Sequence, residues 1–134
     1  MFAMHRSQAR AYSTIHVETG VASADPHRLV ELLIDGALEA LAEAVVALQR
    51  RDLPAKGRAI TRAVSIIDEG LRGGLDRERG GAVAAQLDTL YTCVTHRLTQ
   101  ANLKNDLALL NECRGLLMPL REAWQAIRPQ AVAA

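Results

Sequence analysis

The chain has 134 residues, a length typical of one domain that buries a core without metal or disulfide support. Its 16 basic and 15 acidic residues give a formal net charge of +1, and the two signs are mixed along the chain, which argues against nucleic-acid binding. Hydrophobic residues make up 49% of the chain and aromatic residues only 3%, and no run alternates β-branched or aromatic residues with polar ones. This composition predicts an all-α fold with a core of leucine and alanine.

Residues 1–24 show little helical periodicity, so we expect them to form a flexible or loosely docked N-terminal arm. The arm lacks the long apolar run and the cleavage site of a secretory signal, which predicts a cytoplasmic protein. It nevertheless carries Tyr12, Ile15 and Val17, which a free tail would have little reason to retain. Two interpretations stay open: the arm packs on the rest of the domain, or the arm and a partner share a hydrophobic groove.

The first helix is predicted to begin at Asp25, a capping residue followed by proline, and to continue to about Arg50. Between residues 29 and 48 the charged residues are all acidic and recur every four positions. At about 100° per residue, these acidic residues span about 120° of the helix circumference and leave about 240° apolar. Packing against one core requires an apolar stripe of only about 100°. The helix is therefore central or also faces a partner, and its carboxylates argue against membrane insertion. We expect these residues to form a solvated stripe: Glu31, Asp35, Glu39 and Glu43.

Three further apolar periodicities follow, each bounded by glycine, proline or capping residues. The short connections between them predict an antiparallel up-down four-helix bundle over residues 25–128, with a C-terminal tail at 129–134. The expected second, third and fourth helices cover about 55–72, 82–101 and 106–127.

Two segments of the bundle carry signals that interrupt helices. Residues 75–81 are charged and flanked by glycine pairs, so we expect a solvated loop. Pro119 lies inside the fourth helix, where it removes one hydrogen bond and crowds the Gly115 carbonyl. We therefore expect a kink or a locally opened turn at that position.

No arrangement of residues points to catalysis, to a metal or to a cofactor. The histidines are scattered, no HExxH motif occurs, and no Glu precedes a His by three positions, which excludes a zinc-peptidase helix and a di-iron bundle. The residues after His96 do not fit a histidine phosphotransfer domain. Cys93 and Cys113 are isolated on apolar helical positions, so we expect buried, reduced thiols. These absences favour a binding protein over an enzyme.

A set of short segments, in order along nearly the whole chain, resembles the flagellar secretion chaperone FliS family. The arm contributes residues 12–19 (YSTIHVET), and the start of the first helix contributes 23–29 (SADPHRL) and 33–38 (LIDGAL). The other matching segments are 56–60, 65–71, 87–91, 101–106 and 123–124. The chain departs from the family pattern at Ala9, where the family often has a larger apolar residue, and at Pro119.

The resemblance implies a cytosolic, non-enzymatic export chaperone without a cofactor. Such a protein binds the C-terminal segment of flagellin, prevents premature polymerisation and keeps flagellin competent for flagellar type III secretion. The flagellar export gate and an anti-sigma factor are further candidate partners, whereas nucleic acid is not implied. The main alternative is a helical-bundle adaptor that binds a different regulatory protein.

The family's binding tyrosine matches Tyr12, and exposed-face geometry suggests further contacts on the second and third helices. Core packing is the alternative for these helical residues. In a bundle the first helix contacts two neighbours, which accounts for much of its apolar arc and makes it a scaffold. We therefore expect flagellin to contact Tyr12, Ile15, Val17, Ile60, Val64, Ile67, Leu71, Leu90 and Tyr91.

Overall fold

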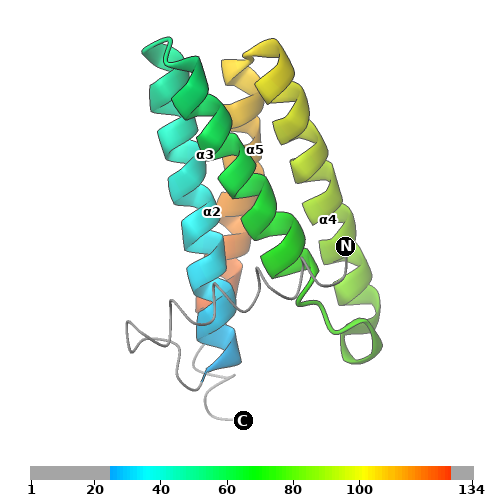
Figure 1. Ribbon diagram of the computed structural model, residues 1–134. Helices are drawn as coiled ribbons and strands as arrows, with labels where there is room; N and C mark the ends of the chain where they lie inside the picture. The colour runs from blue at the N-terminus through cyan, green and yellow to red at the C-terminus, as the bar shows by residue number, and fades with distance from the viewer. Residues whose placement is uncertain (1–24, 128–134) are drawn as a thin grey trace.

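The computed structural model describes residues 25–127, and within this range all regular structure is helical. Its elements are α2 (Pro26–Gln49), α3 (Leu53–Ser65), the π-helical segment η1 (Ile66–Arg72), α4 (Arg77–Lys104) and α5 (Leu107–Ala126). The four long helices run alternately up and down (Figure 1). α2 and α4 each pack against α3 and α5, so they lie diagonally opposite. The structure confirms the predicted all-α four-helix bundle; the expected arm and tail lie outside the described residues.

Aspartates at the helix starts explain where the chain turns into each α-helix. Each carboxylate accepts a hydrogen bond from a backbone N–H of the first turn, at 3.0–3.2 Å. The α2–α3 and α4–α5 turns contain Arg51 and Asn105, which adopt left-handed φ values of 61° and 51°. The four capping residues are Asp25, Asp52, Asp76 and Asp106.

α2 is the central element of the core. Ala37, Ala40 and Ala44 are fully buried and allow the neighbouring helices to approach closely. Ile34 and Leu41 fill the space between the helices. Leu98, Leu110 and Leu117 close the core from α4 and α5. Contact with α3, η1 and α5 explains the broad apolar arc of α2, so its interpretation as a scaffold agrees with the packing.

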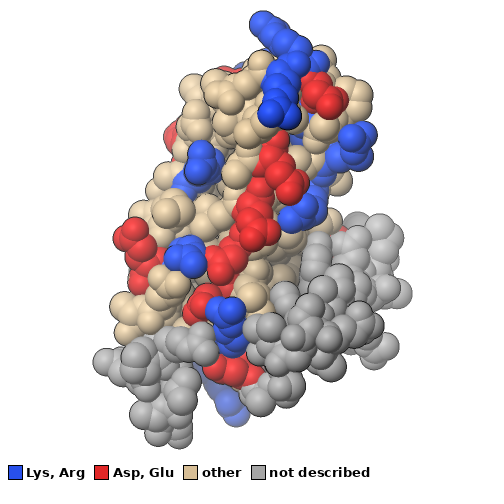
Figure 2. Space-filling view, turned by 90° about the vertical axis from the view of Figure 1, so that its left-hand side faces the viewer, with Lys and Arg blue, Asp and Glu red and all other residues tan. Residues whose placement is uncertain are grey.

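The acidic stripe of α2 is only partly solvated, which corrects the sequence-based expectation. Figure 2 shows acidic side chains in a column along this face of the bundle. Glu31 is only 5% exposed and forms an ion pair with Arg28. Asp35 is half-buried and accepts a hydrogen bond from Arg121 of α5. Glu39 and Glu43 are exposed, although Glu43 forms an ion pair with Arg62 of α3, so only part of the stripe is solvated.

The second helix differs from its predicted form because it widens after Ser65 into η1. A π-helical turn holds more residues than an α-helical one and is frequent at functional sites. Gly70 lies in this segment against α2, where an added Cβ would stand 3.1 Å from Leu33. Apolar spacing at 60, 64, 67 and 71 suits an ordinary helix and contains no signal for this change.

The structure differs in part from the expectations at the other two interrupting segments. α4 begins at Arg77 rather than at 82, because Asp76 caps one helical turn before the chain breaks at Gly81, whose φ is 50°. α5 continues through Pro119 as a helix, so of the two expected outcomes, a kink or a locally opened turn, the opened turn is not found. Gly115 is exposed, so solvent is available to its carbonyl, which receives no hydrogen bond from the proline.

Candidate functional site

An apolar groove opens between η1 and the first half of α4, at the end of the bundle where α2 begins and α5 ends. It encloses about 340 Å³. The η1–α4 hairpin extends away from α2 here (Figure 1), and Val83 of α4 is 62% exposed. The groove is lined chiefly by Val30, Leu71, Leu75, Val83, Leu87, Tyr91 and Trp124.

The floor and the rim of the groove differ in exposure. Leu71 and Tyr91 are 4% and 2% exposed and form the floor, where burial raises the pKa of Tyr91 to about 12. Leu75 and Leu87 are half-buried, and Val83 at the rim is 62% exposed. An apolar side chain entering the groove would therefore meet packed surface below and partly exposed apolar surface beside it.

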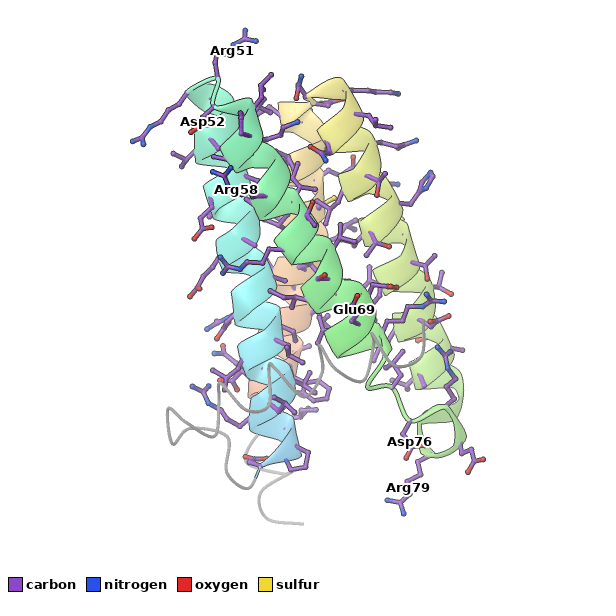
Figure 3. The ribbon with its side chains drawn as sticks, viewed as in Figure 1. Arg51, Asp52, Arg58, Glu69, Asp76 and Arg79 are labelled. Carbon is purple, nitrogen blue, oxygen red and sulfur yellow. The ribbon has the colours of Figure 1, made fainter. Side chains whose placement is uncertain are left out.

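The glycine pair at 80–81 shapes the outer rim. Gly81 takes a left-handed φ, which L-residues rarely adopt, and an added Cβ at Gly80 would lie 2.6 Å from that of Ala84. Figure 3 shows Asp76 and Arg79 at the tip of this hairpin. Glycine at both positions lets the capped turn fold back closely on α4.

A charge cluster fastens η1 to α4 behind the groove. Arg72 donates hydrogen bonds to Asp88 at 2.7 Å and to Asp68 at 3.1 Å, and Arg77 donates to Asp88 at 3.1 Å. These two guanidinium donors hold the pKa of Asp88 below its usual value, and the same contact raises the pKa of Arg72. The cluster fixes the spacing of the two groove walls.

A stacked pair closes the groove on the α2–α5 side. The rings of His27 and Trp124 lie 4.8 Å apart and nearly parallel. Trp124 Nε1 donates to the His27 carbonyl at 2.9 Å, and His27 Nε2 donates to the Trp124 carbonyl at 2.8 Å. These reciprocal bonds hold Trp124 in the wall of the groove.

The predicted site residues are only partly gathered in this groove. Leu71 and Tyr91 lie in its floor, while Ile60 and Ile67 lie in the core, as the core-packing alternative anticipated. Val64 and Leu90 are half-buried; they pack against the core and do not line the groove. The arm candidates lie outside the described residues: Tyr12, Ile15 and Val17.

Sequence reasoning missed several groove residues. Leu75 falls in the segment expected to be a solvated loop, and Val83, Leu87 and Trp124 belong to the apolar periodicities of the third and fourth helices, which carry no sign of a groove. An apolar series that begins at Val83, directly after a glycine-bounded turn, extends beyond the part of α4 that buries its side chains. This mismatch is visible only once the burial of α4 is known.

Neither cysteine forms a disulfide. Cys113 is fully buried, and burial raises the pKa of its thiol to about 11. Cys93 is only half-buried and accepts a hydrogen bond from Arg97 Nε at 3.3 Å, so the expectation of a buried thiol holds for Cys113 alone.

Other site types leave no trace in the described part of the chain. No group of three or more His, Cys, Asp or Glu side chains within residues 25–127 is arranged to hold a metal ion. None of the helices described here has the length and apolar character needed to cross a membrane. The groove is therefore the strongest candidate site that the described residues provide.

Comparison with known proteins identifies the family. A family model described as "Flagellar protein FliS" matches residues 8–131. The flagellar secretion chaperone FliS of Salmonella typhimurium is 47% identical over 125 residues, which cover 93% of each chain. The flagellar secretion chaperone FliSB of Pseudomonas aeruginosa is 43% identical over 95% of this chain and 98% of its own. The FliS of Bacillus subtilis is 32% identical over 87% and 86% of the two chains. The chain therefore belongs to the FliS family of flagellar proteins.

Proposed function

We propose that this chain is a cytoplasmic flagellar secretion chaperone that binds the C-terminal segment of flagellin. By binding, it prevents premature polymerisation and keeps flagellin competent for flagellar type III secretion. The observation that supports this most is the open apolar groove between η1 and α4, in a chain 47% identical to a protein named flagellar secretion chaperone. The proposed action is binding, without catalysis and without a cofactor.

The groove suits an amphipathic helix of the partner. An apolar side chain that enters the groove beside Val83 and Leu87 replaces water on the α4 wall, and each fully buried Leu-sized side chain contributes about 1.5–3 kcal/mol. Covering the apolar face of the flagellin segment removes the surface through which it would join other subunits. The bound segment then stays unpolymerised until it is exported.

The arm residues keep the role expected from the resemblance. We expect Tyr12, with Ile15 and Val17, to contact the flagellin segment directly. Tyr12→Ala should then weaken binding while the thermal unfolding of the bundle stays unchanged. An unchanged affinity, or a large loss of thermal stability, would contradict this role. The export gate and an anti-sigma factor remain candidates for further partners.

Isothermal titration calorimetry of the full chain with the C-terminal segment of flagellin tests the proposal. The expected result is a saturable heat with a fixed stoichiometry and a negative heat-capacity change, the mark of apolar burial. An N-terminal flagellin segment serves as the control. Absence of both heat and complex would overturn the proposal, and a pull-down that recovers another regulatory protein in a flagellin deletion strain would favour the adaptor.

A further inference from the structure

The end of the bundle opposite the groove collects the unpaired cations of the described residues. Five of the Lys and Arg side chains within residues 25–127 form no hydrogen bond or ion pair. Four of them lie at or near the α2–α3 and α4–α5 turns, and Figure 2 shows basic side chains above the acidic column. These four are Arg50, Arg51, Arg58 and Lys104.

The carboxylates at this end are already engaged. Asp52 and Asp106 accept hydrogen bonds from the first turns of α3 and α5, and Glu43 pairs with Arg62. Figure 3 shows Arg51 projecting from the top of the bundle, with Asp52 beside the start of α3. The unpaired cations thus leave a local positive excess on a chain whose formal net charge is only +1.

Large apolar side chains are exposed among these cations. Leu103 is 80% exposed, the highest value for a large apolar residue in the described chain, and Leu53 is 43% exposed. They lie in the last turn of α4 and the first turn of α3. Neither belongs to the core, and each lies next to one of the two connections, Leu53 after the α2–α3 turn and Leu103 before the α4–α5 turn.

A buried lysine joins the two turns into one surface. Lys56 is 5% exposed, and its Nζ donates to the Asn102 carbonyl at 2.9 Å and to Asn105 Oδ1 at 2.6 Å. These bonds tie the start of α3 to the end of α4. The cations and leucines therefore lie on a fixed surface, which we name the turn end: Arg50, Arg51, Leu53, Arg58, Leu103 and Lys104.

We propose that the turn end is a second docking surface, which binds an acidic protein segment carrying an exposed apolar side chain. Carboxylates of the segment pair with the four cations, and its apolar side chain packs against Leu103 and Leu53. This surface lies at the opposite end of the bundle from the groove. The two sites are therefore separable by mutation.

A protein segment suits this surface better than nucleic acid or a membrane. Four cations fall short of the six to ten phosphate contacts of a typical DNA-binding protein, and the aromatic residues of the described chain lie at or near the groove. The engaged carboxylates beside the cations would repel a continuous anionic surface. They tolerate a segment whose charges are discrete and spaced.

A fluorescence anisotropy titration of the full chain tests the proposal with a labelled helical peptide that carries glutamates around a central pair of leucines. Binding should weaken with added salt, because exposed charges are screened. Replacing the peptide's leucines by serine should weaken binding about fivefold or more. Arg50→Glu combined with Lys104→Glu should weaken binding about tenfold or more.

Matched variants separate this surface from general charge and hydrophobicity. Arg114→Glu reverses the fifth unpaired cation, on α5, and should leave the affinity unchanged. Leu103→Ser should weaken binding about fivefold, whereas Met118→Ser, on exposed α5 surface, should not. No binding, or an equal loss with Arg114→Glu, would overturn the proposal. Tighter binding of a DNA duplex or of phosphatidylserine vesicles would overturn its assignment to a protein segment.

Discussion

α2 and α4 lie diagonally opposite in one bundle but bury their residues differently. Ten of the 24 residues of α2 are buried, and they extend along the helix from His27 to Leu48. Only five of the 28 residues of α4 are buried, and Ala84 alone precedes Tyr91 among them. α2 is thus committed to the core along its length, whereas the first half of α4 leaves apolar surface available to a partner.

This difference shows why apolar surplus in a sequence does not identify a binding face. The most apolar helix of the chain is the scaffold, since α3, η1 and α5 cover it. The groove lies instead on a helix of mixed composition, where Val83 is exposed and Leu87 is only half-buried. Unpartnered apolar residues, rather than the total number of them, mark the candidate site.

The largest loss of stability is expected from a substitution in the buried face of α2. Leu41→Ala removes a fully buried side chain between the helices, so the free energy of unfolding should fall by about 2–5 kcal/mol. Urea denaturation followed by circular dichroism measures the loss. A loss smaller than that of an exposed substitution such as Met118→Ala would contradict the scaffold role.

Gly81→Ala should have an intermediate effect, because alanine at a φ of 50° is strained. The free energy of unfolding should fall by about 1–2 kcal/mol. Gly115→Ala provides the control, since Gly115 has no atom within 4 Å of an added Cβ and should instead gain helix stability. Equal effects at the two positions would show that the rim turn is not constrained.

Val83→Asp should separate binding from stability. Val83 is 62% exposed, so thermal unfolding should change little, whereas a carboxylate placed against an incoming apolar helix should weaken flagellin binding about tenfold or more. Calorimetry measures the affinity. Met118→Asp, outside the groove, should leave it unchanged, and an unchanged affinity for Val83→Asp would remove the groove from the account.

Asp88→Asn should have the smallest effect, and one that depends on pH. The arginines lower the pKa of Asp88 in the folded state, so ionised Asp88 stabilises the fold above its unfolded pKa of about 4. This contribution is lost as the pH falls through the lower folded pKa. The stability difference between wild type and variant should therefore be full at neutral pH and shrink below about pH 4. A pH-independent difference would contradict this mechanism.

Much of the bundle was predictable because its signals are local. Capping aspartates and apolar spacing correctly identified four helices, and Asp25 with Pro26 correctly located the start of the first. The π-helical form of η1 was not predictable, since it depends on how residues 66–72 pack against α2 and α4. Tertiary contacts of this kind leave no periodic pattern in the sequence.

The candidate site was less predictable than the fold. Helical spacing placed Ile60 and Ile67 on an apolar face, but spacing alone does not distinguish a face turned toward the core from one turned toward a groove. Leu75 appeared solvated because of its charged neighbours, although the hairpin folds it against the groove wall. Only the spatial arrangement of η1 and α4 separates these roles.

Amide hydrogen exchange of the full chain, with and without the C-terminal segment of flagellin, tests whether this segment binds at the η1–α4 groove. If the segment docks on the η1–α4 groove, peptides covering residues 70–91 should gain protection. Peptides from the core of α2, residues 37–48, should stay equally protected in both states because this helix is already packed. Protection gained elsewhere, with no change across residues 70–91, would contradict the account.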